Sequence, residues 1–70
     1  MAVNLNEAQA LAPNWDNLSV EQQLSWVNSE LIKLADPGNL WQKHGYEDLL
    51  AARFSMLQGQ RKVLTDVQAA

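Results

Sequence analysis

The sequence predicts an all-α protein built on a helical hairpin, two long antiparallel helices with a short N-terminal helix docked against them. Ala and Leu supply 9 and 11 of the 70 residues, whereas Val, Ile and Thr together supply only 7. Helix formers therefore outweigh β-branched residues, and no stretch alternates apolar and polar residues over the length of a strand. We expect one small helical domain over residues 1–70, since 47% apolar residues can form one core.

The first expected element is a short helix over residues 4–12. Asn4 or Asn6 can cap its start, and Pro13 ends it. A helix of about nine residues is not stable by itself, so this one has to dock on the rest of the chain. The turn that follows contains Trp15, which fits either a core anchor or an exposed contact residue.

The second helix is expected over residues 20–35. Ser19 and Gln22 have the spacing of a capping box, in which each residue bonds the backbone of the other. The apolar residues then recur at alternating intervals of four and three, as in a heptad seam. These seam residues are Val20, Leu24, Val27, Leu31 and Leu34. The segment 36–39, Asp-Pro-Gly-Asn, ends the helix.

The third helix is expected over residues 46–67, after a loop with one short turn at Leu40 and Trp41. Acidic residues stand in its first turn and basic residues near its end, which suits the helix dipole. Its apolar residues form two rows. One row holds Leu50, Phe54, Leu57 and Leu64, and the second row holds Leu49, Met56, Val63 and Val67.

The two rows cover about half of the third helix, whereas the second helix offers a stripe of only about 80°. The third helix must therefore pack against more than the second helix. The additional cover is the N-terminal helix, a second copy of the chain in a homodimer, or another protein. The sequence leaves these three alternatives open.

Several residues on or beside this wide face are candidates for a protein interface. Arg53 lies between the two rows, with Gln60 near it, and Arg is enriched at interface centres. The alternative is that Arg53 is buried and pairs with Glu30 or Glu21. Trp26 and Ile32 lie about 100° to either side of the second helix's stripe. The candidate protein-interface residues are Trp26, Ile32, Arg53, Phe54, Met56 and Gln60. Trp41, like Trp15, fits a core or an interface position.

The sequence offers no recognisable catalytic site. The chain has no cysteine and one histidine, His44, which excludes disulfides, thiolate metal sites and sites with several histidines. It also has no glycine-rich phosphate loop and no nucleophile–base set. We therefore expect a protein that is not an enzyme, with no catalytic residues, no metal and no cofactor.

Charge and hydropathy limit the partners further. The net charge of −3 argues against nucleic-acid binding. Residues 1–52 carry seven acids and two bases, a net of −5, which suits a basic partner surface. No apolar run reaches the length of a membrane span, and no signal peptide is recognisable. We expect a cytoplasmic protein with a protein partner and no membrane or nucleic-acid partner.

Residues 48–61 resemble the first helix of small phage head–tail joining proteins. The resemblance covers a fifth of the chain, and the β-hairpin that follows the helix in those proteins has no counterpart here, so it identifies no family. Taken together, the residues predict a non-enzymatic interaction protein that binds a larger protein as an inhibitor, adaptor or regulator. The alternative is a small structural subunit of a phage particle or another multi-chain assembly.

Overall fold

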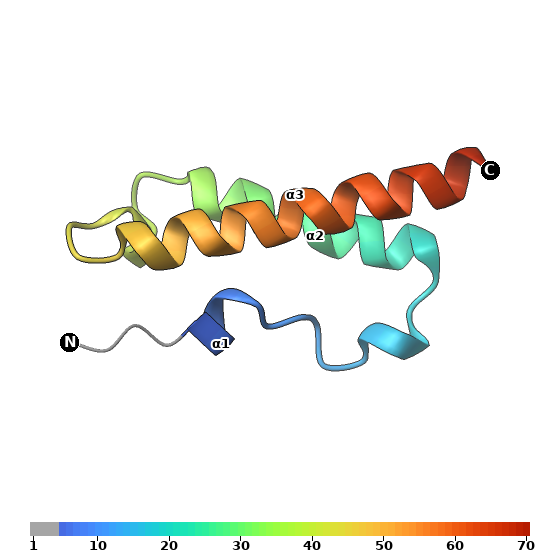
Figure 1. Ribbon diagram of the computed structural model, residues 1–70, viewed down its shortest axis with the longest axis horizontal. Coiled ribbons are helices and arrows are strands. Elements are labelled where there is room, and N and C mark those ends of the chain that lie inside the picture. Colours follow the sequence, from blue (N-terminus) through green and yellow to red (C-terminus); the bar gives the residue numbers. More distant parts are fainter. Residues whose placement is uncertain (1–4) are drawn as a thin grey trace.

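The computed structural model describes residues 5–70 and shows two long antiparallel helices with an N-terminal segment along one side (Figure 1). The helices are α1 (Leu5–Ala8), α2 (Val20–Ala35) and α3 (Glu47–Ala69). Two short 3-10 helices, η1 (Trp15–Asn17) and η2 (Leu40–Gln42), lie between them, and residues 5–70 contain no strand. The predicted all-α helical hairpin with a short docked N-terminal helix is confirmed.

Helix α2 begins and ends at the predicted residues. The Ser19 hydroxyl accepts a hydrogen bond of 3.1 Å from the Gln22 amide, and the Gln22 side chain accepts one of 2.9 Å from the Ser19 amide. This reciprocal pair satisfies two amides that a helix start otherwise leaves unpaired. At the other end, the Asp36 carboxylate accepts a bond of 2.9 Å from the Gly38 amide, which turns the chain away from the helix axis.

The connection between the long helices is held by Asn39. Its side-chain oxygen accepts a bond from the Trp41 amide at 2.8 Å and so begins η2. Its side-chain nitrogen donates to the carbonyl oxygen of Lys33, also at 2.8 Å. These bonds fasten η2 to the end of α2. Gly45 then takes a φ of 99°, which a residue with a Cβ rarely adopts, immediately before the start of α3.

The core follows the seam between α2 and α3. Val27 and Leu34 of α2 pack with Leu57 and Leu64 of α3, and all four side chains are buried. The two α2 residues belong to the predicted heptad seam, and the two α3 residues belong to the first apolar row. The seven-residue spacing therefore predicted the correct helix faces.

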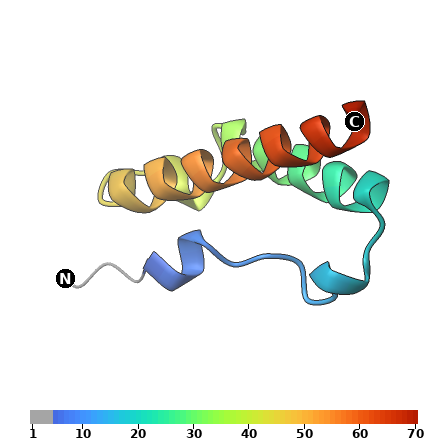
Figure 2. The same ribbon diagram turned by 45° about the vertical axis from the view of Figure 1, so that its right-hand side comes forward.

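The N-terminal segment, residues 5–18, lies along one side of the hairpin in both views (Figures 1 and 2). Helix α1 contacts α3, and its Ala8 is fully buried. Farther along, the Gln23 side chain of α2 donates a bond of 2.8 Å to the carbonyl oxygen of Trp15. The N-terminal segment thus packs on part of the wide apolar face of α3. It was the first of the three alternatives that the sequence left open for this face.

Helix α1 is shorter than the predicted helix over residues 4–12. It ends at Ala8, while residue 4 lies outside the described part of the chain. The carbonyl oxygens of Ala8 and Ala10 accept bonds from the Arg53 side chain. In a continuing helix they would accept bonds from amides four residues later, so the tertiary contact replaces the helix. Helix α3 starts one residue later and ends two residues later than predicted.

Candidate functional site

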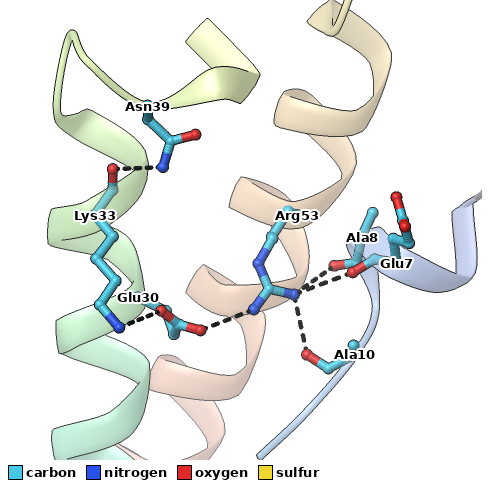
Figure 3. A network of polar contacts seen from close by, with 7 residues as sticks. All are labelled: Glu7, Ala8, Ala10, Glu30, Lys33, Asn39 and Arg53. Atoms are coloured by element: carbon cyan, nitrogen blue, oxygen red, sulfur yellow. Dashed lines mark hydrogen bonds and ion pairs between the residues drawn. The ribbon is translucent and has the colours of Figure 1, made fainter.

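Arg53 of α3 joins three parts of the chain (Figure 3). Only 11% of its side chain is exposed. Its Nη1 donates to the carbonyl oxygens of Glu7, Ala8 and Ala10 at 3.3, 3.2 and 3.0 Å, and its Nη2 donates to Glu30 Oε1 at 3.2 Å. Hydrogen bonds from a charged donor are stronger than neutral ones. Arg53 therefore fastens the N-terminal segment to both long helices.

Glu30 of α2 is the counter-ion of Arg53. It is one of the two acids that the sequence offered for this role, and the other, Glu21, is exposed at the start of α2. The second carboxylate oxygen of Glu30 pairs with Lys33 Nζ at 3.4 Å. Because Arg53 and Glu30 are both largely buried, each compensates the desolvation of the other. Both Nη1 and Nη2 of Arg53 therefore donate hydrogen bonds within the chain itself.

Two tryptophans, Trp26 and Trp41, lie beside Arg53 of this ion pair, and the third, Trp15, packs on Trp26. The Arg53 Cζ atom lies 5.8 Å from the ring centroids of both Trp26 and Trp41, within the range of a cation–π contact. Trp15 meets Trp26 edge to face, with centroids 5.5 Å apart. All three pack against the core and are half-buried. The N-terminal segment brings Trp15 onto Trp26, so this candidate interface residue has an aromatic neighbour within its own chain.

The six predicted interface residues do not form one patch. Arg53 and Trp26 meet inside the molecule, and Met56 is half-buried against the core. Phe54 and Ile32 are exposed by 47% and 73%, but they belong to different helices. The neighbours of Ile32 one turn earlier on α2, Asn28 and Ser29, are polar. A single exposed apolar side chain is normal on a protein surface, so Ile32 alone does not indicate a contact.

The second apolar row of α3 changes from covered to open along its length. Leu49 is 8% exposed, Met56 is half-buried, and Val63 and Val67 are exposed by 57% and 52%. Gln60, beside this row, is half-buried. The N-terminal segment contacts α3 near Arg53 and then continues to α2, so it does not follow the row to its end. We call Met56, Val63 and Val67 the valine edge.

A groove lies near the other edge of α3, beside Phe54. Its volume is about 520 Å³. Its lining residues are Leu34, Ala35, Gln42, Glu47, Leu50, Ala51 and Phe54. Most of these side chains are apolar, and Glu47 contributes the one charge. We call this feature the Phe54 groove.

The loop before α3 adds a local electrostatic contact. The backbone amides of Glu47 itself and of Gly45 donate to the Glu47 carboxylate, which holds the pKa of that group below its ordinary value of 4.5. His44 Nδ1 lies 3.1 Å from Glu47 Oε1 and acts in the same direction. The Glu47 side chain stays 65% exposed, so the carboxylate remains accessible to other molecules.

Sequence reasoning assigned no interface role to Val63 and Val67, although it placed both in the second row. The signal that could have identified them is length. A short N-terminal helix cannot cover a row that runs from residue 49 to residue 67, about 27 Å at the rise of an α-helix. The groove wall formed by Leu34 and Ala35 was also missed, because it depends on how α2 sits against α3.

Other kinds of site receive little support in the described residues. In residues 5–70, no group of three or more His, Cys, Asp or Glu side chains is placed to hold a metal ion. None of the helices described is both long and apolar enough to cross a membrane. Comparison with protein-family models, curated proteins and solved structures found no match for this chain.

Proposed function

We propose that this chain is a small non-enzymatic interaction protein that binds a larger protein as an inhibitor, adaptor or regulator. The observation that carries the proposal is the valine edge. Its row is buried at Leu49 and exposed at Val63 and Val67. An apolar strip that the fold itself leaves open is typical of a protein-contact surface.

The spacing of the valine edge suits a helix that lies in an apolar groove of its partner. Val63 follows Met56 by seven residues and precedes Val67 by four, so the three side chains share one face of α3. Binding of this kind can block or bridge a surface of the larger protein without chemistry.

Purification of the tagged full-length chain together with its bound protein tests this proposal. The variant Val63→Gln with Val67→Gln keeps good helix-forming residues and removes the apolar strip. The matched control is Ile32→Gln, which removes an even more exposed apolar side chain from α2. We expect wild type and control to retain one stoichiometric partner, and the double variant to bind that partner at least about tenfold more weakly.

Equal retention of that protein by all three chains would contradict the proposed surface. Failure of wild type to retain any protein would contradict the proposed function. Circular dichroism of each chain gives the necessary control, since the substituted side chains are exposed and the helices should persist.

A second candidate function, a structural subunit of a multi-chain assembly, is favoured by a different observation. Large apolar side chains are exposed on three separate elements, at Ile32 of α2, Leu40 of η2 and Val63 of α3. In an assembly, neighbouring chains would cover each of these positions. Light scattering distinguishes the two candidates, because a subunit forms large particles as its concentration rises, whereas a regulator forms a complex of fixed size.

A further inference from the structure

We propose that the Phe54 groove binds a second copy of this chain, through an antiparallel contact between the two α3 helices centred on Phe54. This surface is separate from the valine edge, so the inference does not rest on the proposed function. Three features carry it: an exposed aromatic ring beside an apolar groove, the spacing of three exposed residues, and the sign of their charges.

The first feature is that the ring and the groove lie together. Phe54 is 47% exposed and also forms part of the groove wall with Leu50 and Ala51. Ala51 is small enough to let another helix approach α3 closely at this point. An exposed aromatic ring is a common anchor of a protein interface.

The second feature is the spacing along α3. Glu47, Phe54 and Arg61 are all exposed and follow one another at seven-residue intervals. On an α-helix that interval returns to the same side with a drift of about 20°. The three residues therefore form one row, which passes along the Phe54 groove. Glu47 and Arg61 each lie about 10.5 Å along the axis from Phe54, on opposite sides of it.

The third feature is that this row is complementary to itself. In a two-fold symmetric pair of antiparallel helices, residues equally far before and after the axis face each other. With the axis at Phe54, Glu47 faces Arg61 of the partner subunit, and the same pair repeats on the other side of the axis. A negative side chain thus meets a positive one twice.

The groove also suits the side chain that this arrangement places in it. Arg61 carries a long apolar stem below its charged group. The stem can lie over the apolar walls made by Leu34 and Leu50, while the guanidinium reaches the carboxylate of Glu47 in the same groove. A charged side chain with a shorter aliphatic part would cover the apolar walls less well. The apolar walls and the carboxylate of the groove therefore match the stem and the guanidinium of Arg61, in addition to the two-fold match of charges along the row.

Solution mass measured against concentration tests the proposal on the full chain. A contact made by one pair of helices is smaller than a standard interface, so we expect weak association. The mass should rise with concentration from 7.8 kDa toward twice that value. Phe54→Ala should weaken dimerisation at least about tenfold, whereas Ile32→Ala should leave it unchanged.

A charge exchange between chains gives the decisive measurement. Glu47→Arg places Arg opposite Arg61 of the partner subunit, and Arg61→Glu places Glu opposite Glu47 of the partner subunit. Each variant alone should therefore dimerise about tenfold more weakly than wild type. In a mixture of the two variants both facing pairs become attractive, so a 1:1 heterodimer should form with affinity close to that of wild type.

The controls use neighbouring charges outside the row. Asp48→Arg and Lys62→Glu make the same changes of net charge but lie roughly 80–120° around α3 from the centre of that row, so they should have smaller effects. A chain that stays monomeric at every concentration would overturn the proposal. So would a dimer that is insensitive to Phe54→Ala, or variants whose mixture fails to restore association. The variant of the valine edge should dimerise like wild type, which separates this test from that of the proposed function.

Discussion

Arg53 Nη1 donates a hydrogen bond of 3.0 Å to the carbonyl oxygen of Ala10, a residue 43 positions earlier in the chain. Ala10 belongs to no helix, and its carbonyl lies in a stretch that the sequence predicts to be helical. The contact therefore replaces a local hydrogen bond with a long-range one. The contact also fixes residue 10 beside Arg53 of α3. Beyond this point, Val63 and Val67 of the second apolar row are exposed.

The first prediction concerns the hydrogen bonds and the ion pair of Arg53. Arg53→Met keeps much of the side-chain length but removes the donors to the N-terminal segment and to Glu30. Because the ion pair is largely buried, we expect the free energy of unfolding to fall by about 2–3 kcal/mol in a denaturant titration. Amide hydrogen exchange should also accelerate in residues 5–18 more than in the α2–α3 seam.

The matched control for that prediction is Lys62→Met, which removes an exposed positive charge from the same helix outside the proposed dimer contact. Its effect should stay below about 0.5 kcal/mol. Unchanged exchange in residues 5–18 of the Arg53 variant would show that apolar contacts alone hold the N-terminal segment.

The second prediction concerns the core. Leu57 is fully buried between the long helices, whereas Leu31 on the same seam is only half-buried. Leu57→Ala should lower the free energy of unfolding by about 3 kcal/mol, since it leaves a cavity among buried residues. Leu31→Ala should cost about 1–2 kcal/mol, because water can reach the site. Equal losses for the two variants, measured by denaturant titration, would place the centre of the core elsewhere.

The third prediction concerns pH. The pKa of Glu47 is lowered in the folded chain, first by its own amide and by that of Gly45. A carboxylate with a lowered pKa stabilises the folded state above its unfolded pKa, and that stabilisation is lost as the pH falls through the folded pKa. Wild type should therefore be more stable than Glu47→Gln at pH 6, and the difference should shrink as the pH falls below about 4.5.

Thermal melting of both chains from pH 6 to pH 3 measures that difference. The measurement is made at low concentration, where dimerisation is not significant. Asp48→Gln serves as a reference in the same helical turn. A constant difference across the range would mean that the charge of Glu47 does not contribute to the start of α3.

The fourth prediction concerns Gly59, which lies in the middle of α3. A Cβ built at this position meets no atom within 4 Å apart from its own helix backbone and chain neighbours, and the residue is exposed. Gly59→Ala should therefore stabilise the protein by about 0.5–1 kcal/mol, since alanine loses less backbone entropy in a helix. A lower melting temperature for this variant would indicate that the position needs its glycine for a contact with another molecule.

Much of the hairpin was predictable because its signals are local. Ser19 and Gln22 cap α2 through a hydrogen-bond pair three residues apart, and the turn at 36–39 ends the helix. The alternating intervals of four and three identify the face of α2 that carries Val27 and Leu34. Of the candidate site, the sequence placed Phe54 in the first apolar row and among the interface candidates, because its position follows from helical periodicity.

By itself, then, the sequence determined the helix class, the bounds of α2, the approximate bounds of α3 and the faces that form their seam. These depend on capping, periodicity and propensity, which act within a few residues. Only the tertiary structure decided that Trp26 packs with Trp15, that Arg53 binds backbone carbonyls of the N-terminal segment, and that Val63 stays open. Each of these depends on how residues 5–18, which are distant in sequence, pack against the two long helices. A guanidinium bonded to three backbone carbonyl oxygens can outweigh the local preference of residues 9–12 for a helix.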